Sequence, residues 1–238
     1  SRTTSYIVAQ VNGKPVSPAD AAFGQQENVD HWYNLSAIDV KTDAKTPVVA
    51  VLGNSITDGF GIMNAEAKGY PAQLQKKLGD KYEVKNFGVS ARTMMNKGDL
   101  PYMNELAWRD AQAFNPDIVI VKLGTNDSKT HNWAHGADEY RQSMQAMIDT
   151  LKALPSKPKI YLCSPIPAFK DSWTISDSII VNGEMPIIKK LAKKNKCQFI
   201  DLHTSYTYGD MMLKDGIHPN AKGAEKMANI IFEAIEKK

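Results

Sequence analysis

The 238-residue sequence has few cysteines, no long apolar run and little net charge. It has only two cysteines, Cys163 and Cys197, which the expected strands place at opposite ends of parallel neighbours. We therefore expect free thiols and no disulfide, and they do not reveal the compartment. No apolar run reaches the about 18 residues that cross a bilayer, which excludes an integral membrane segment. The net charge is only +3, which argues against nucleic-acid binding.

The sequence also shows neither a metal-binding spacing nor a signal peptide. His131 and His135 are spaced i, i+4, but no third ligand has suitable spacing and Gly136 indicates a loop, so we expect no metal site. No signal peptide is present, and the chain begins with Ser1-Arg2 rather than with Met. We expect a processed or trimmed chain, and this leaves export open.

Five apolar runs alternate with helical patterns along most of the chain. The runs are β-branched and nearly continuous, which is typical of a parallel sheet covered on both faces. The alternation predicts an α/β protein, a three-layer α/β/α sandwich. We expect a flavodoxin-like five-stranded parallel sheet of order 2-1-3-4-5. Pro186 lies inside the fourth helical pattern and is expected to break or kink it. The expected strands are Val48–Gly53, Tyr82–Gly88, Asp117–Gly124, Lys159–Pro165 and Gln198–His203, and the expected helices are Pro71–Leu78, Asn104–Phe114, Ala137–Leu154, Ser176–Lys194 and Ala221–Ile235.

The first 46 residues do not follow this alternation. An apolar run over Tyr6–Val11, followed by Asn12-Gly13, indicates a strand and a hairpin turn. We expect residues 1–46 to form a small N-terminal β extension packed on a main domain of residues 47–238. The alternative is that this segment is the tail of a further domain.

Two motifs far apart in the chain supply the parts of a serine hydrolase. Ser55, in Gly-Asn-Ser-Ile-Thr-Asp-Gly, directly follows the first strand, and Asp215-Gly-Ile-His218-Pro precedes the last helix. The Gly216 turn lets Asp215 accept the Nδ1 proton of His218, so that Nε2 can take the Ser55 proton. Each motif alone is better explained as a turn or a helix cap. Together they predict nucleophilic attack on a carbonyl.

Two other strand ends supply candidate donors for an oxyanion. Asn126, in Gly-Thr-Asn-Asp after the third strand, has an amide that could donate to the oxyanion, although a helix N-cap is the common alternative. Gly88 ends the second strand, and a glycine lets its N–H approach a substrate, although a plain turn glycine fits equally. In the order 2-1-3-4-5 these residues flank Ser55 at the carboxyl edge, where ligands bind.

These motifs, in this order and spacing, resemble the SGNH (GDSL-type) hydrolase superfamily over about residue 46 to the C-terminus. Its four signature positions are matched by Ser55, Gly88, Asn126 and His218, and its acid by Asp215. The resemblance implies a carboxylic ester hydrolase with a Ser–His–Asp triad and no cofactor. It also implies an oxyanion hole made by the N–H groups of Ser55 and Gly88 and by the Asn126 side chain.

Within the superfamily, the chain is most similar to secreted bacterial carbohydrate O-acetylesterases. The resemblance implies an acetylated carbohydrate (sialic acid or plant polysaccharide) or another small ester as substrate, and a secreted or periplasmic location. Asn54 stands where the family usually has Asp, but it is not a triad member, so we expect activity to survive. The aromatic residues that could contact a sugar, each also suited to packing, are Phe60, Trp133 and Trp173.

Two other functions fit the same motifs. A lipase, lysophospholipase or thioesterase would need a long apolar channel; no long apolar insertion follows the strands, although Met94, Met95, Met211 and Met212 could line a flexible pocket. A non-catalytic carbohydrate-binding module is hinted at only by Asn54, and the intact Ser55, Asp215 and His218 argue against it. The oligomeric state is not predicted.

Overall fold

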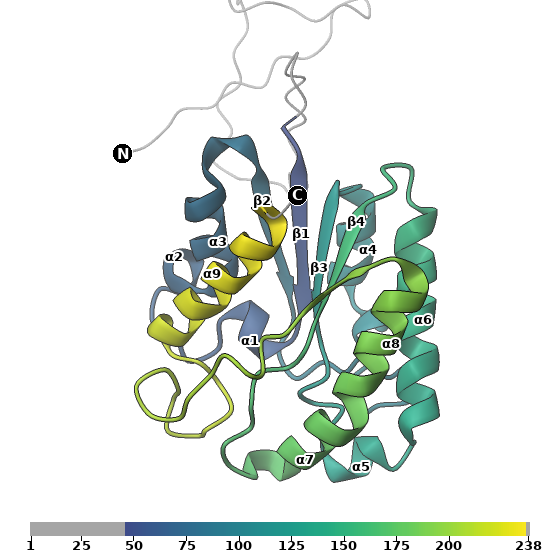
Figure 1. The fold of residues 1–238 in the computed structure, drawn as a ribbon, viewed down its shortest axis with the longest axis vertical. Coiled ribbons are helices and arrows are strands. Elements are labelled where there is room, and N and C mark those ends of the chain that lie inside the picture. The colour runs from purple at the N-terminus through teal and green to yellow at the C-terminus, as the bar shows by residue number, and fades with distance from the viewer. Residues whose placement is uncertain (1–45, 237–238) are drawn as a thin grey trace, which may run out of the picture. The chain divides into compact units, whose positions relative to one another are not determined.

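The computed structural model describes residues 46–236, in which five parallel strands form one sheet of order β2-β1-β3-β4-β5 (Figure 1). The predicted flavodoxin-like order is therefore confirmed. β1 lies between β2 and β3, and its last residue, Gly53, pairs with Gly88 on one side and with Lys122 on the other. The strands are β1 Val48–Gly53, β2 Glu83–Gly88, β3 Ile118–Lys122, β4 Lys159–Cys163 and β5 Gln198–Ile200.

Helices cover both faces of the sheet. In Figure 1, α3 and α9 lie on one face, and α4, α6 and α8 lie on the other. The α-helices are α1 Ser55–Asp58, α2 Ala65–Lys68, α3 Tyr70–Leu78, α4 Leu106–Ala113, α5 Thr130–Trp133, α6 Ala137–Ala153, α7 Asp177–Ile179, α8 Met185–Asn195 and α9 Ala221–Glu236. Shorter 3-10 segments are η1 Gly79–Lys81, η2 Tyr102–Asn104 and η3 Ser172–Thr174, and a π-helical segment, η4, spans Ile180–Glu184.

The alternation of side chains along the strands divides the core into two layers. In β1, Ala50 and Leu52 pack with the α4–α6–α8 layer, whereas Val49 and Val51 pack with the α3–α9 layer. Successive side chains of a strand point to opposite faces, so a strand buried on both faces must be apolar at every position. This is why the strands appear in the sequence as continuous apolar runs.

Two details differ from, or refine, the predicted elements. The fourth helical pattern is split into α7, η4 and α8, and Pro186 lies in the first turn of α8, where its missing N–H is tolerated. The predicted break at Pro186 is therefore confirmed. β5 ends earlier than predicted because the N–H groups of Leu202 and His203 donate to Ser164 Oγ instead of to a strand.

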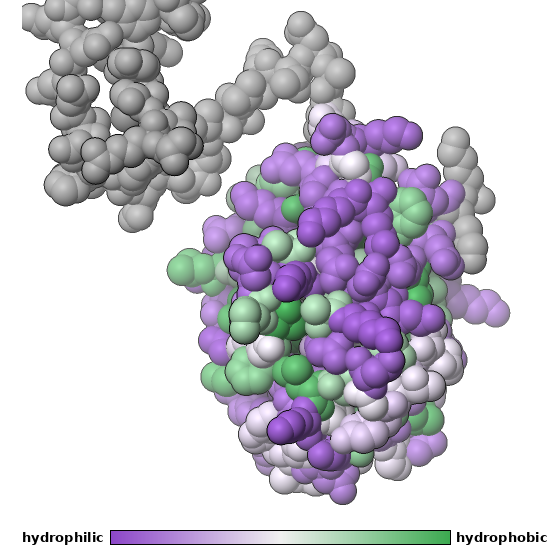
Figure 2. All heavy atoms as spheres, turned by 90° about the vertical axis from the view of Figure 1, so that its left-hand side faces the viewer, coloured by the Kyte–Doolittle hydropathy of each residue, from purple (hydrophilic) through white to green (hydrophobic). Residues whose placement is uncertain are grey.

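Figure 2 views the molecule from the side of α3 and α9, and hydrophilic residues dominate this surface with hydrophobic ones interspersed. None of the helices within residues 46–236 combines the length and apolar character that crossing a bilayer requires. The predicted N-terminal β extension lies outside the described residues, except for residue 46, and the domain boundary stays a prediction. Cys163 and Cys197 are free thiols.

Candidate active site

Ser55 lies where β1 passes into α1, at the carboxyl edge of the sheet, which is the lower end of the strands in Figure 1. Asn54 is the N-cap of α1, and its Oδ1 accepts the N–H of Ile56 at 3.2 Å. Ser55 is thus the first residue of the helix. Asn54 accepts the N–H groups of the next three residues of this turn, so among the first-turn donors only the Ser55 N–H is left for a ligand.

The structure joins Ser55 to His218 and Asp215 in one hydrogen-bonded chain. Ser55 Oγ lies 2.9 Å from His218 Nε2, and His218 Nδ1 lies 2.9 Å from Asp215 Oδ2. The other carboxylate oxygen of Asp215 accepts the backbone N–H groups of Ile217 and His218 at 2.8 and 2.9 Å. The turn at Gly216, which has a φ of 72°, brings the carboxylate back onto the ring as predicted. This geometry suits transfer of the Ser55 proton to Nε2.

The electrostatics of the chain favour a neutral imidazole beside an ionised carboxylate. Burial lowers the pKa of His218 below its usual 6.5; the contact with Asp215 opposes this effect, and the charge of Lys122 adds to it. Partial burial opposes ionisation of Asp215, but the hydrogen bonds from His218 and Ile217 outweigh it and lower its pKa below 3.8. His218 can therefore act as a base while Asp215 stays charged.

Asn54, which stands where the SGNH family usually has Asp, is fully buried and directly precedes Ser55. Its Oδ1 caps α1, but its Nδ2 has no hydrogen-bond partner within residues 46–236. The capping bond needs only an oxygen acceptor, which both Asn and Asp supply. Asn54 therefore keeps the cap and leaves the Ser55–His218 contact intact.

Gly88 does not lie where the oxyanion prediction placed it. Its N–H donates to Asn86 Oδ1 at 2.8 Å, and Gly88 is not among the residues that line the pocket around Ser55. A Cβ at Gly88 would collide with the backbone of Thr57 and Asp58 in α1. The glycine is needed because α1 packs directly on the end of β2, and not for access to a substrate.

Ala91, three residues further along the same loop, lines the pocket where Gly88 does not. It has a φ of 67°, in the left-handed region that glycine favours. Neither its N–H nor that of Ser55 has a hydrogen-bond partner in the part of the chain that the structure describes. Both backbone donors are therefore free for an oxyanion.

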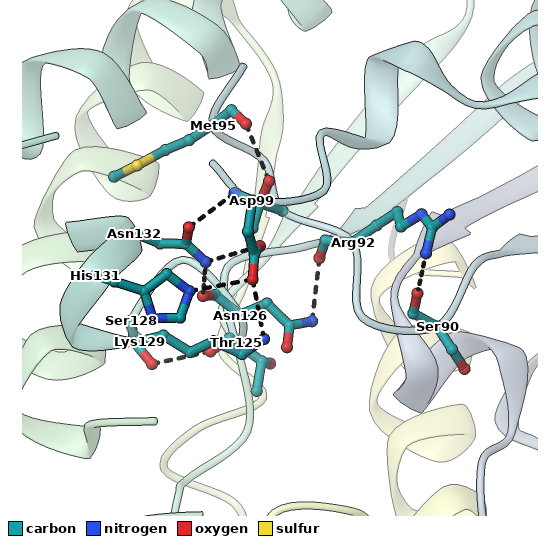
Figure 3. Close-up of polar contacts among 11 residues, drawn as sticks. Ser90, Arg92, Met95, Asp99, Thr125, Asn126, Ser128, Lys129, His131 and Asn132 are labelled. Carbon is teal, nitrogen blue, oxygen red and sulfur yellow. Dashed lines mark hydrogen bonds and ion pairs between the residues drawn. The ribbon is translucent and has the colours of Figure 1, made fainter. Parts of the chain in front are cut away.

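Asn126 lines the same pocket. Its Nδ2 donates to the carbonyl oxygen of Arg92 at 3.1 Å (Figure 3), which leaves its second amide hydrogen for a ligand. The Asn126 carbonyl accepts from the buried Asn132 amide, and Asn132 also bonds Asp99. This network, drawn in Figure 3, ties the loop after β3 to the loop after β2.

Asp127 makes a second tie between these loops. Its fully buried carboxylate accepts the backbone N–H groups of Met94 and Met95 at 2.9 and 2.7 Å. Burial raises the pKa of Asp127 to about 7, against the lowering effect of these two hydrogen bonds. Met94 and Met95 are buried in the core and do not line the pocket.

Two of the three aromatic residues predicted to contact a sugar flank His218. The rings of Phe60 and Trp173 lie 4.6 and 5.7 Å from the imidazole ring, and both side chains are about half exposed. Trp173 and Thr174 both have positive φ, an unfavourable backbone that persists only where the surroundings impose it. Ser172 Oγ donates to the carbonyl oxygen of Asp215, which fixes this segment on the loop of Asp215 and His218.

Trp133 does not take part, and its prediction as a sugar contact is corrected. The ring packs 5.8 Å from Tyr140 and against Gly183, on the core between α5 and α6. Its place on the inner side of a short helix, rather than in the loop before it, turns the ring away from the pocket.

The pocket over Ser55 has a volume of about 200 Å³. It contains one side chain with a formal charge, Lys129, whose ammonium lies 3.5 Å from Asp99. No group of three or more possible metal ligands occurs among the side chains of residues 46–236. The lining residues are Ser55, Phe60, Ser90, Ala91, Thr125, Asn126, Lys129, Trp173, Ile175, Ile217 and His218.

The sequence analysis did not single out Ala91, Lys129 or Lys122. Ala91 had a weak signal, because a second small pair, Ser90-Ala91, follows Gly88 in the same loop. Lys122 had a stronger one, because a charged residue inside a continuous apolar run must be buried with the strand. Lys129 lies in a polar turn and has no signal that separates it from a surface lysine.

Fold and site together define a class: α/β/α proteins with a strand-end serine joined to histidine and aspartate at the carboxyl edge of a parallel sheet. The chain belongs to the GDSL-like lipase/acylhydrolase family, whose model matches residues 51–226. The predicted SGNH resemblance, and with it the assignment to a family of carboxylic ester hydrolases, is thereby confirmed.

The chain is similar to three esterases in sequence or in structure. An acetylxylan esterase of Xylanibacter ruminicola is 55% identical over 206 residues, which are 79% of this chain and 43% of that protein. The structure of Est24, a carbohydrate acetylesterase from Sinorhizobium meliloti, matches with a TM-score of 0.66 at 22% identity, covering 79% of this chain and 98% of that one. The acetyl xylan esterase AlAXEase matches with a TM-score of 0.62 at 25% identity, covering 79% and 99%. The chain thus spans less than half the length of the Xylanibacter relative.

Proposed function

We propose that this chain hydrolyses O-acetyl esters of carbohydrates, with Ser55 as nucleophile, His218 as general base and Asp215 as its orienting partner. The observation that carries the proposal is the unbroken hydrogen-bonded chain from Ser55 Oγ to Asp215, which opens onto a pocket. A serine hydroxyl is a weak nucleophile unless a base takes its proton, and His218 Nε2 is placed to do so.

The reaction proceeds through an acetyl-enzyme. Ser55 Oγ attacks the acetyl carbonyl as His218 takes its proton, and the tetrahedral oxyanion is stabilised by the N–H groups of Ser55 and Ala91 and by the Asn126 amide. The sugar hydroxyl leaves with the proton from His218. Water, activated by the same imidazole, then attacks the acetyl group and releases acetate and free Ser55.

The dimensions of the pocket favour a short acyl group on a sugar. Its volume of about 200 Å³ is below the about 300–1,000 Å³ of pockets that enclose drug-sized ligands, so a long acyl chain has no room there. The half-exposed rings of Phe60 and Trp173 at His218 offer apolar faces to the sugar that carries the ester. The 55% identical relative is an acetylxylan esterase, which supports an acetylated plant polysaccharide above sialic acid, and an extracellular location.

A panel of esters tests this function. Acetate release is measured from acetylated xylan, 9-O-acetylated sialic acid and p-nitrophenyl esters of two to eight carbons. We expect release from acetylated xylan and p-nitrophenyl acetate, with kcat/KM for acetate exceeding that for octanoate by about tenfold or more, since the pocket excludes the extra methylenes. The Ser55→Ala protein is the blank.

Other outcomes of the panel point to other functions. Faster hydrolysis of octanoate than of acetate contradicts the small acyl pocket and supports the lipase or thioesterase reading. Sugar binding without any turnover, unchanged in Ser55→Ala, supports a carbohydrate-binding module. Release from sialic acid alone moves the substrate away from plant polysaccharides but keeps the mechanism.

The pH dependence follows from the His218 imidazole. Burial lowers the pKa of His218 below 6.5, and only the neutral ring accepts the Ser55 proton. We therefore expect kcat/KM for p-nitrophenyl acetate to be constant from about neutral pH down to the mildly acidic range, and to fall as His218 gains a proton below pH 6.5. A steady-state pH profile measures this, and an acid limb centred above 6.5 contradicts it.

A further inference from the structure

A lysine is buried directly behind the turn that carries Asn126. Lys122 is the last residue of β3, is fully buried and pairs in register with Gly53, two residues before Ser55. Its Nζ donates to Thr125 Oγ1 at 2.9 Å. Thr125 and Asn126 both line the pocket, so the lysine connects the end of the strand to the pocket wall. An ammonium in such a place is unfavourable unless an opposite charge compensates it.

A second ionisable side chain is buried beside the same turn, and burial raises its pKa well above the usual 4.5. Glu184, at the end of the π-helical segment η4, is fully buried, and neither of its oxygens has a hydrogen-bond partner among residues 46–236. The same is true of the Tyr140 hydroxyl. A Cβ added to Gly124 would lie 2.5 Å from Glu184 Oε2 and 2.9 Å from the Tyr140 hydroxyl. Both groups therefore occupy the space beside Gly124 that a side chain would need. π-helical segments such as η4 are frequent at functional sites.

The ionisable groups around Lys122 come from several elements. They are Cys163 at the end of β4, Glu184 in η4 and His218 in the loop before α9, with Asp127 and Tyr140 next to Glu184. Burial lowers the pKa of Lys122 to about 7, against Cys163 and Glu184, which raise it. In the range below 6.5, where His218 titrates, Lys122 keeps its proton and lowers the pKa of His218.

We propose that Lys122 is a positioning residue for the reaction: through its hydrogen bond to Thr125 it fixes the turn that presents Asn126, and its buried charge acts on His218. This inference rests on the proposed function of the site. A purely structural role does not explain a fully buried lysine, because an apolar side chain of similar volume stabilises a core as well or better.

Kinetics of four variants separate the two parts of the proposal. Lys122→Met is expected to lower kcat for p-nitrophenyl acetate about tenfold or more, as a loosened oxyanion donor loses part of its about 10²–10³-fold contribution, with a smaller change in KM. The acid limb of the pH profile of Lys122→Met moves to higher pH, because the loss of a nearby positive charge raises the pKa of His218. Thr125→Val is expected to lower kcat without moving the limb. Lys159→Met, an exposed lysine at the amino end of β4, is the matched control and changes neither. The fourth variant, Lys122→Met/Glu184→Gln, removes both ionisable side chains. It takes the place of Lys122→Met in these measurements if Lys122→Met does not fold.

An NMR titration tests the same link without turnover. The His218 imidazole resonance is assigned by its absence in His218→Gln, and His131 and His135 are internal references. We expect the midpoint of His218 to rise in Lys122→Met and in the double variant. The proposal is overturned if the His218 midpoint in folded Lys122→Met or in the folded double variant equals that of the wild type. It is also overturned if both variants keep the wild-type kcat. If the wild-type chain hydrolyses no ester, the proposed function fails, whereas the titration still decides whether Lys122 acts on His218.

Discussion

Replacement of Ser55 by alanine is expected to lower kcat for acetyl ester hydrolysis by about 10⁴-fold or more. The hydroxyl oxygen is the atom that bonds to the acetyl carbon, and no other hydroxyl lies within hydrogen-bonding distance of His218 Nε2 in residues 46–236. The residual rate would come from the oxyanion donors acting on a bound ester attacked by water. Steady-state kinetics on p-nitrophenyl acetate, with acetate release from xylan in parallel, measures the loss.

The matched control for this substitution is Ser156→Ala, in the loop before β4 at the opposite edge of the sheet. The Ser156 hydroxyl is buried without a partner, so its removal should leave kcat and the folded state unchanged. Thermal unfolding and circular dichroism establish that both variants fold. If folded Ser55→Ala keeps more than about a tenth of the wild-type kcat, Ser55 is not the nucleophile.

Replacement of Asp215 by asparagine is expected to lower kcat by about 10⁴-fold with little change in KM. The carboxylate accepts the Nδ1 proton of His218 with one oxygen and two backbone N–H groups with the other. An asparagine that keeps its oxygen on the backbone donors turns its NH₂ toward Nδ1. The ring must then carry its proton on Nε2, and that nitrogen can no longer accept the Ser55 proton.

A second Asp–His pair in the molecule supplies the control. Asp177 Oδ1 lies 2.9 Å from His203 Nε2 and also accepts the N–H of Ala168, but this pair is not connected to Ser55. Asp177→Asn should therefore leave kcat within about threefold of the wild type. Equal losses of kcat in Asp177→Asn and Asp215→Asn would show that the effect of Asp215→Asn is structural. A wild-type kcat in folded Asp215→Asn would show that Asp215 has no part in the mechanism.

The strands were predictable because the information is local. A strand covered on both faces must be apolar throughout, and β3, with Ile118–Lys122, shows this directly in the sequence. The alternation of strand and helix predicts only the α/β/α sandwich; the order 2-1-3-4-5 is that of the flavodoxin-like fold, and the structure has it. The motif residues Ser55, Asp215 and His218 were predictable as a group because each follows the carboxyl end of a strand, and these ends share one edge.

The direction of individual side chains was not predictable, because it depends on partners far away in the sequence. Gly88 and Ala91 lie in one short loop, and only the packing of α1 on β2 decides which of them faces the pocket. Trp133 and Trp173 are equally plausible sugar contacts as sequence. Trp133 packs in the core beside Tyr140. The hydrogen bond from Ser172 to the Asp215 carbonyl holds the segment of Trp173 beside His218.

The sequence by itself determined the fold class, the family resemblance and the three residues of the Ser–His–Asp chain, since these depend on periodicity and on short motifs that act locally. Tertiary structure alone decided the free backbone donor at Ala91, the size of the pocket, and the burial of Lys122 and Glu184 near the turn that begins at Gly124. The physical reason is the same for all three: burial and close approach are properties of segments that meet only after the chain has folded.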